Sequence, residues 1–164
     1  MDLEALMKQD KFLMGILIGI GVLILVALVI FFTRQQDKQA YAVETTPDGV
    51  VHNYVLALLN KDYQKAYGYL ADLDKKPTFE AFRKSFATGS LTPSSAGVKI
   101  GKADVTGEDA TVEVSMIYSS SDPFSSGYNN VGSAQLVMQN GIWKISNMPA
   151  YTLWDYSWYQ TPPK

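Results

Sequence analysis

The sequence contains no cysteine and only one histidine, His52. Zinc and haem sites need several convergent histidine, cysteine or carboxylate ligands. We therefore expect no zinc or haem site and no resident cofactor. The sequence also has no glycine-rich phosphate loop and neither the GxSxG nor the HExxH motif, each of which would have indicated a particular chemistry.

An excess of one charge is also absent. Lys and Arg number 14 and Asp and Glu number 16, which gives a formal net charge of −2. Nucleic-acid binding depends on clustered positive charge that neutralises phosphates, and the chain has no basic run. We therefore expect no nucleic-acid partner.

No charged residue, proline or polar side chain occurs in residues 12–32, FLMGILIGIGVLILVALVIFF. A helix of this length, at 1.5 Å per residue, spans about 30 Å, the thickness of the hydrocarbon core of a bilayer. Lipid offers no hydrogen bonds to the backbone, so an isolated segment crosses it as a helix. The stretch predicts one transmembrane helix and makes the membrane the first expected partner.

Two other interpretations of this stretch fit the surrounding residues less well. A cleaved signal peptide has an apolar region of about 7–15 residues and small residues at its cleavage site. Here the apolar run is longer and is followed by Thr33 and Arg34. A core helix of a globular protein normally carries a polar stripe, and this stretch has none.

The predicted membrane helix contains a GxxxG motif, formed by Gly15 and Gly19. Glycine allows a second helix to approach closely, and close packing drives helix association in lipid. The motif indicates that this face packs against a helix of another subunit.

The orientation in the membrane follows from weak signals. Lys8 and Lys11 precede the span, while Arg34 and Lys38 follow it, so the positive-inside count is tied. Because a short N-terminal tail ahead of a signal anchor commonly stays inside, we expect a single-pass cell-membrane protein. Its N-terminus would be cytoplasmic and its C-terminal domain extracytoplasmic.

The rest of the chain divides by composition. Residues 1–11 form a short tail of mixed charge, either a helix at the membrane surface or a frayed end. Residues 33–46 are polar and predict a juxtamembrane linker. A Thr-Pro-Asp sequence at Thr46 then predicts a helix start. Residues 47–148 predict one domain, and residues 149–164 form an aromatic-rich tail.

The domain pattern changes from helical to alternating spacing near its middle. Helices are expected at residues 47–60, 63–73 and 79–87. Antiparallel strands are expected at residues 96–106, 110–118, 132–139 and 142–148. The inward parity switches at Gly101-Lys102, which predicts a β-bulge, and Asn140-Gly141 predicts a hairpin turn. The fold class is therefore α+β, with three helices packed on a curved four-stranded antiparallel sheet.

Two segments resemble the NTF2-like superfamily of cone-shaped α+β domains. Residues 50–70, VVHNYVLALLNKDYQKAYGYL, resemble its opening helix pair, and residues 140–148, NGIWKISNM, resemble its last hairpin. The resemblance covers residues 47–148. It implies a fold and a pocket between helices and sheet, which Tyr54 and Tyr67 could line, and it does not imply a reaction.

Enzymes of this superfamily place an Asp or His base inside the cone. In this sequence Asp104 and Glu113 alternate with apolar residues that face inward, so both carboxylates should point away from the helices. His52 lies at the border of an apolar stripe, where a histidine is more often satisfied or solvated than a base. We therefore expect no enzyme activity.

The tail combines five aromatic residues, a density typical of buried clusters or interfaces. These residues are Tyr151, Trp154, Tyr156, Trp158 and Tyr159. Two interpretations remain open. The tail either folds back over its own sheet, or it docks on a partner or at the lipid headgroups, where Trp and Tyr are enriched. We favour docking on a partner.

These observations predict a non-catalytic accessory subunit of a larger membrane complex, held by its transmembrane helix and its tail. Bacterial electron-transfer complexes, respiratory or photosynthetic, carry small subunits of this shape, so the resemblance implies such a setting. The alternative is a membrane-tethered NTF2-like domain that binds a small apolar ligand in its cone.

Overall fold

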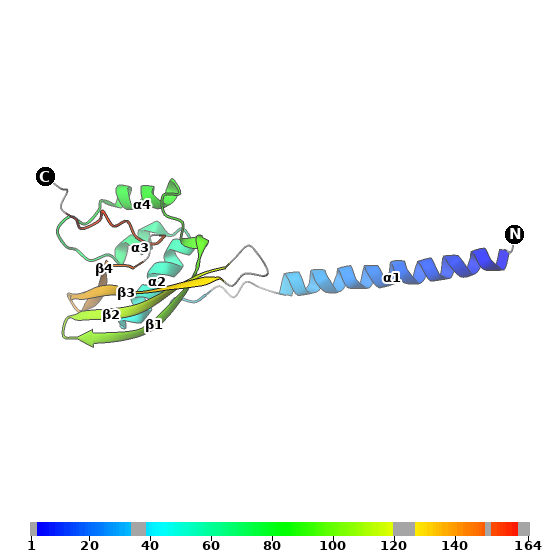
Figure 1. The fold of residues 1–164 in the computed structure, drawn as a ribbon, viewed down its shortest axis with the longest axis horizontal. Coiled ribbons are helices and arrows are strands. Elements are labelled where there is room, and N and C mark those ends of the chain that lie inside the picture. Colours follow the sequence, from blue (N-terminus) through cyan, green and yellow to red (C-terminus); the bar gives the residue numbers. More distant parts are fainter. Residues whose placement is uncertain (1–2, 34–38, 120–126, 150–151, 161–164) are drawn as a thin grey trace. The chain divides into compact units, whose positions relative to one another are not determined.

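The computed structural model describes residues 3–33, 39–119, 127–149 and 152–160 (Figure 1). The chain divides into two compact units, Met1–Ala40 and Tyr41–Lys164. Each unit is considered by itself below.

The first unit consists of one long helix, α1 (Leu3–Thr33). Its stretch Leu13–Ile30 has a mean hydropathy of 3.1, and none of this stretch is buried. By length and composition α1 can cross a membrane. The helix also takes in most of the predicted N-terminal tail, so residues 3–11 continue the apolar helix as regular backbone.

The second unit begins with its central helix, α2 (Pro47–Leu59). The side chain of Thr46 accepts a hydrogen bond from the Gly49 N–H at 3.3 Å, and Pro47 occupies the first turn, where its missing N–H costs nothing. The predicted helix start is therefore confirmed. The side chains of Val51 and Tyr54 have no exposed surface, which makes α2 the helix around which the unit packs.

Helix α3 (Tyr63–Gly68) is shorter than the sequence predicts. Its predicted cap is confirmed, because the Asp62 carboxylate accepts the Lys65 N–H at 3.1 Å. Beyond Gly68 the chain leaves the helix, and Leu70 forms an isolated parallel bridge with Ile145. The apolar spacing over residues 63–73 suits a helix, but the open edge of the sheet takes these backbone groups instead.

Helix α4 (Phe79–Ala87) follows and matches its predicted bounds. Thr78 caps it by accepting the Ala81 N–H at 3.3 Å, and Phe82 and Phe86 form its buried side. A short 3-10 helix, η1 (Pro93–Ser95), leads into the sheet.

The sheet contains four antiparallel strands in the order β1-β2-β3-β4. They are β1 (Gly97–Thr106), β2 (Asp109–Tyr118), β3 (Tyr128–Gln139) and β4 (Ile142–Asn147). The register between β1 and β2 shifts between Ile100 and Ala103, which confirms the predicted bulge. The turn from β3 to β4 has φ values of 53° at Asn140 and 78° at Gly141, as the Asn-Gly sequence predicts.

Strand β3 starts earlier than predicted. Its first residue, Tyr128, pairs with Tyr118, so that β3 accompanies β2 to its end. The sequence over residues 128–131 is polar enough to suggest a loop, but pairing with a long neighbouring strand satisfies its backbone.

Helix α2 lies against one face of the sheet, α3 packs on α2, and α4 packs on α3 (Figure 1). On β2 the side chains of Val112 and Val114 are fully buried beneath the helices, while Thr111 and Glu113 are exposed on the other face. The predicted α+β class, with three helices on a four-stranded antiparallel sheet, is therefore confirmed.

The second unit extends beyond the predicted domain of residues 47–148 at both ends. At its beginning, the buried Asn53 side chain on α2 holds the backbone of Ala42. Its Oδ1 accepts the Ala42 N–H at 2.7 Å, and its Nδ2 donates to the Ala42 carbonyl at 2.9 Å. Residues 41–46, assigned to the linker by composition, are therefore part of the folded unit.

Gly49 allows this segment to pass close to α2. A methyl group at Gly49 would overlap the carbonyl oxygen of Val43. Replacing Gly49 by alanine should therefore destabilise the second unit by about 1–3 kcal/mol, the usual range for overpacking. Urea unfolding of the full-length chain in a non-ionic detergent would measure the change, followed by tryptophan fluorescence.

The matched control is Gly68→Ala in α3, where an added methyl group meets nothing within 4 Å. This substitution should not lower stability. All three tryptophans, Trp143, Trp154 and Trp158, lie in the second unit, so the fluorescence signal reports on that unit alone. Equal unfolding midpoints for the two variants would contradict the close approach of residues 43–46.

Candidate functional site

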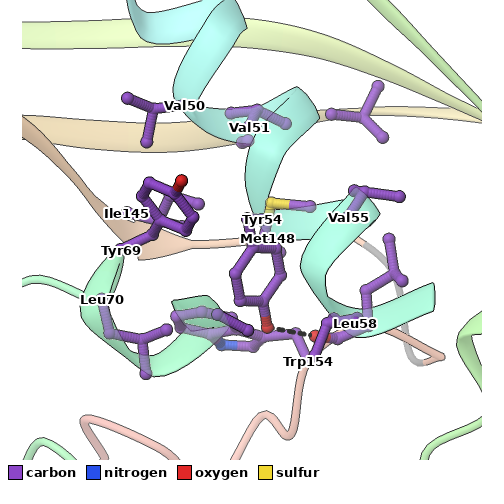
Figure 2. Close-up of a cluster of buried hydrophobic side chains, with 14 of the residues drawn as sticks. Val50, Val51, Tyr54, Val55, Leu58, Tyr69, Leu70, Ile145, Met148 and Trp154 are labelled. Carbon is purple, nitrogen blue, oxygen red and sulfur yellow. Dashed lines mark hydrogen bonds between the residues drawn. The ribbon is translucent and has the colours of Figure 1, made fainter. Parts of the chain in front are cut away.

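The interior between helices and sheet is the first candidate site, since the family resemblance implies a pocket there. Tyr54 projects from α2 into this interior and has no exposed surface. Its hydroxyl donates to the carbonyl of Leu153 at 2.7 Å, and its ring meets the Trp154 indole edge-on, with ring centroids 6.4 Å apart (Figure 2). Burial raises the pKa of the Tyr54 hydroxyl well above its usual value, so the group stays a neutral donor.

Tyr67, the second predicted pocket residue, is also a packing residue. Its ring lies edge-on to Phe79 and to Phe82, each with a centroid separation of 5.5 Å. Its hydroxyl donates to the Pro77 carbonyl at 2.8 Å. That Tyr54 and Tyr67 line a pocket stays a prediction, although both rings pack against other aromatic side chains.

The tail packs its own aromatic side chains against residues of α2 and α4. Trp154 is 2% exposed and Trp158 is 7% exposed. The Trp158 ring lies 5.2 Å from the Phe82 ring and 5.0 Å from Trp154, measured between centroids. Figure 1 shows the tail running alongside α4, in agreement with these contacts.

Docking of Trp154 and Trp158 on a partner stays a prediction, which the burial of both side chains in the second unit does not support. Large aromatic side chains contribute most when they are fully removed from water, and here the domain itself removes them. The other interpretation, in which the tail folds back on its own domain, describes these two residues. That interpretation placed the tail over the sheet, whereas the tail packs on the helical side of the domain.

The remaining tail aromatics have different surroundings. The Tyr159 hydroxyl donates to the Ala71 carbonyl at 2.7 Å, and its ring stacks on Trp154 at 5.8 Å. Tyr156 is 37% exposed, the largest exposure among the described aromatic residues of the tail. Tyr151 lies outside the described residues. The docking prediction thus retains only Tyr156 as a side chain with substantial exposed surface.

The predicted packing face of α1 remains a prediction. Neither Gly15 nor Gly19 has an atom within 4 Å of the position that a Cβ would occupy. Both glycines are exposed within the described helix, and the space beside them is open to a second backbone.

The titratable groups considered as bases are arranged as the alternation predicts. Asp104 and Glu113 are exposed on the sheet face away from the helices, and His52 is half-buried on α2. Within the described parts of the chain, no three His, Cys, Asp or Glu side chains gather where they could hold a metal ion.

A cavity that the sequence did not predict opens on the surface of the second unit. It has a volume of about 320 Å³ and is formed by the juxtamembrane segment, α2, α3 and β4. Its lining residues are Glu44, Val50, Lys65, Gly68, Tyr69, Ile142 and Lys144. These residues come from segments far apart in sequence. The only sequence signal for any of them is the alternation along β4, which turns the Lys144 side chain to the face opposite Trp143.

Comparisons with known proteins identify no family for this chain. No family model matches the sequence, and no curated protein is similar to it. Among solved structures, a SEC-C motif containing protein from Rhodopseudomonas palustris aligns with a TM-score of 0.44 and 12% identity. The alignment covers 63% of this chain and 77% of that one.

Two further solved structures carry the NTF2-like description. One is an NTF2-like protein from Campylobacter jejuni, provisionally named a transpeptidase, with a TM-score of 0.43, 12% identity, and coverage of 63% of this chain and 99% of that one. The other, of unknown function, comes from Shewanella oneidensis, with a TM-score of 0.42, 8% identity, and coverage of 59% and 88%. These alignments say nothing about the activity of this chain.

The burial of the tail leads to a stability prediction. Replacing Trp154 by alanine should lower the unfolding free energy by about 3–5 kcal/mol, the usual loss for a buried aromatic residue. Deleting residues 149–164 should remove the cooperative transition altogether. Urea unfolding of the full-length chain, followed by tryptophan fluorescence, measures both effects.

Val131→Ala is a suitable control, because Val131 is 59% exposed on β3 and its truncation should change stability by less than about 0.5 kcal/mol. If the shortened chain unfolds cooperatively at the wild-type midpoint, the tail is not part of the core and docking on a partner regains its support.

Proposed function

We propose that this protein is a non-catalytic, single-span accessory subunit of a membrane protein complex. The observation that carries the proposal is α1, whose stretch Leu13–Ile30 is apolar on every side and unburied. A helix that is apolar all round needs lipid or other apolar helices as its surroundings. The chain would use α1 to enter the membrane and to join its partners there.

The packing of the second unit supports a structural role over the alternative of a ligand-binding cone. A small apolar ligand would need space beside Tyr54, and that space holds Trp154 and Leu153, both essentially without exposed surface. Because the space beside Tyr54 is occupied by the protein's own side chains, we expect the domain to act through contacts of its outer surface with other proteins. Exposed apolar side chains on the outer sheet face, Ile117 on β2 and Val131 on β3, offer one surface for a peripheral subunit.

We retain the membrane location and orientation that are expected from the sequence. In this proposal the chain would span the cell membrane with a cytoplasmic N-terminus and an extracytoplasmic folded unit. The suggestion that the complex carries out electron transfer comes from the family resemblance alone.

The glycine face of α1 provides the test of assembly. Replacing both Gly15 and Gly19 by leucine should leave membrane insertion intact, because leucine is favourable in a membrane helix. It should reduce the fraction of chain in a high-mass species, because the bulky side chains prevent close helix approach. Native gels of tagged protein purified from membranes in a mild detergent would measure this fraction.

Gly21 offers a matched control within the same helix. At 100° per residue it lies on a different side from Gly15 and Gly19, so Gly21→Leu adds the same side chain away from the predicted face. The assembly proposal predicts a high-mass species for wild type and for Gly21→Leu. A wild-type chain that runs only as a monomer would oppose the proposal, and equal behaviour of the two glycine variants would remove the Gly15–Gly19 face from it.

Topology can be tested with a single cysteine, since the chain has none of its own. Ser133 is exposed on β3, and Ser133→Cys changes only one atom type. An impermeant thiol reagent should label this cysteine in intact cells whose outer barrier is open. Labelling that requires rupture of the inner membrane would place the folded unit in the cytoplasm and reverse the proposed orientation. A cysteine introduced at Lys8 serves as the control and should give the opposite result.

A further inference from the structure

Two lysines line the surface cavity of the second unit. Lys65 comes from α3 and Lys144 from β4, and both side chains are half-buried at the cavity wall. Lysine is rarely withdrawn from water without a partner. Among the described residues, no carboxylate forms an ion pair with either ammonium group, and the acids Asp72 and Glu80 pair with Lys76 and Arg83 instead.

Both ammonium groups are instead held in place by neutral groups. The Lys144 Nζ donates to the carbonyl of Gly68 at 2.5 Å. The Lys65 Nζ lies over the ring of Tyr41, 3.3 Å from its centroid, in a cation–π contact. Each ammonium group has three N–H donors, so each keeps donors for a ligand.

The one carboxylate in the cavity wall is already engaged. The Glu44 Oε1 accepts a hydrogen bond from the Tyr69 hydroxyl at 2.7 Å. Burial and this hydrogen bond raise the pKa of Tyr69, so its hydroxyl remains a donor at neutral pH. With two lysines and one glutamate, the cavity has a formal charge of +1, which one monoanion would balance. Asp72, a carboxylate outside the cavity wall that interacts electrostatically with Lys144, is paired with Lys76 at 2.7 Å.

We propose that this cavity binds an organic phosphodiester through Lys65 and Lys144. A phosphodiester carries a single negative charge and has two free oxygens, one for each ammonium group. Val50 and Ile142 line the cavity as well and would contact the carbon groups that flank the phosphate. The volume of about 320 Å³ is at the small end of the range for ligand sites and suits a headgroup-sized molecule. This binding role is independent of the subunit role proposed above.

The direct test is calorimetric titration of the full-length chain, in phosphatidylcholine nanodiscs, with sn-glycero-3-phosphoglycerol. The zwitterionic sn-glycero-3-phosphocholine serves as the matched ligand control and should bind more weakly, because its ammonium group meets two lysines. Lys65→Met and Lys144→Met should each weaken binding about tenfold, as expected when a charge-assisted hydrogen bond is lost.

Two further variants separate ligand binding from general effects. Glu44→Gln keeps an oxygen to accept the Tyr69 hydroxyl but removes the negative charge, and it should strengthen binding several-fold. Lys99→Met alters an exposed lysine on β1, away from the cavity, and should leave affinity unchanged. If Lys144→Met disturbs folding through the loss of its bond to Gly68, Lys65→Met and Glu44→Gln carry the test.

The source of the phosphodiester is resolved by repeating the titration in nanodiscs that contain phosphatidylglycerol. A fall in the apparent affinity of the wild-type chain for the soluble ligand, absent in Lys65→Met, identifies a lipid headgroup as the occupant. An unchanged affinity identifies a water-soluble ligand, and either result supports the site. The proposal is overturned if the wild-type chain shows no binding at millimolar ligand, or if Lys65→Met and Lys144→Met bind as Lys99→Met does.

Discussion

The contact between Tyr54 and the tail is the interaction on which the second unit depends. Tyr54 lies at the centre of α2, and its hydroxyl reaches the backbone at Leu153, 99 positions further along the chain. The bond holds the tail where the Trp154 ring packs edge-on against Tyr54. A phenol buried so completely needs its partner, because an unsatisfied hydroxyl in this interior would cost about 1–3 kcal/mol. The tail is therefore a structural part of the fold.

Local rules predicted most of the elements. The caps at Thr46, Asp62 and Thr78 are decided within one helical turn, and the Asn140-Gly141 turn by two residues, so their sequence signals are sufficient. The end of α3 could not be predicted in this way. Leu70 has the spacing of a helical residue, and only the presence of Ile145 across the sheet edge directs its backbone elsewhere.

The candidate sites were predicted less well than the fold, for the same reason. An aromatic-rich tail has the same composition whether it packs on its own domain or on another protein, and the sequence does not show how much interior the domain leaves unfilled. The surface cavity depends on Lys65, Lys144 and Glu44, which approach one another only after α3, β4 and the juxtamembrane segment have packed. No spacing rule within one element connects them.

Residues 41–44 are held to the folded unit by specific contacts. Composition marks this segment as a linker, but three contacts hold it to the domain: the paired bonds between Asn53 and Ala42, the bond from Tyr69 to Glu44, and the stacking of Lys65 on Tyr41. Asn53 is the one fully buried polar residue among those described, and its amide satisfies both backbone groups of Ala42 as a neighbouring strand would. Because Glu44 and the ring beneath Lys65 both come from this segment, a cavity that binds an anion would exist only while the segment is docked. The docking of residues 41–44 on the folded unit and the charge balance of the cavity thus depend on the same few residues.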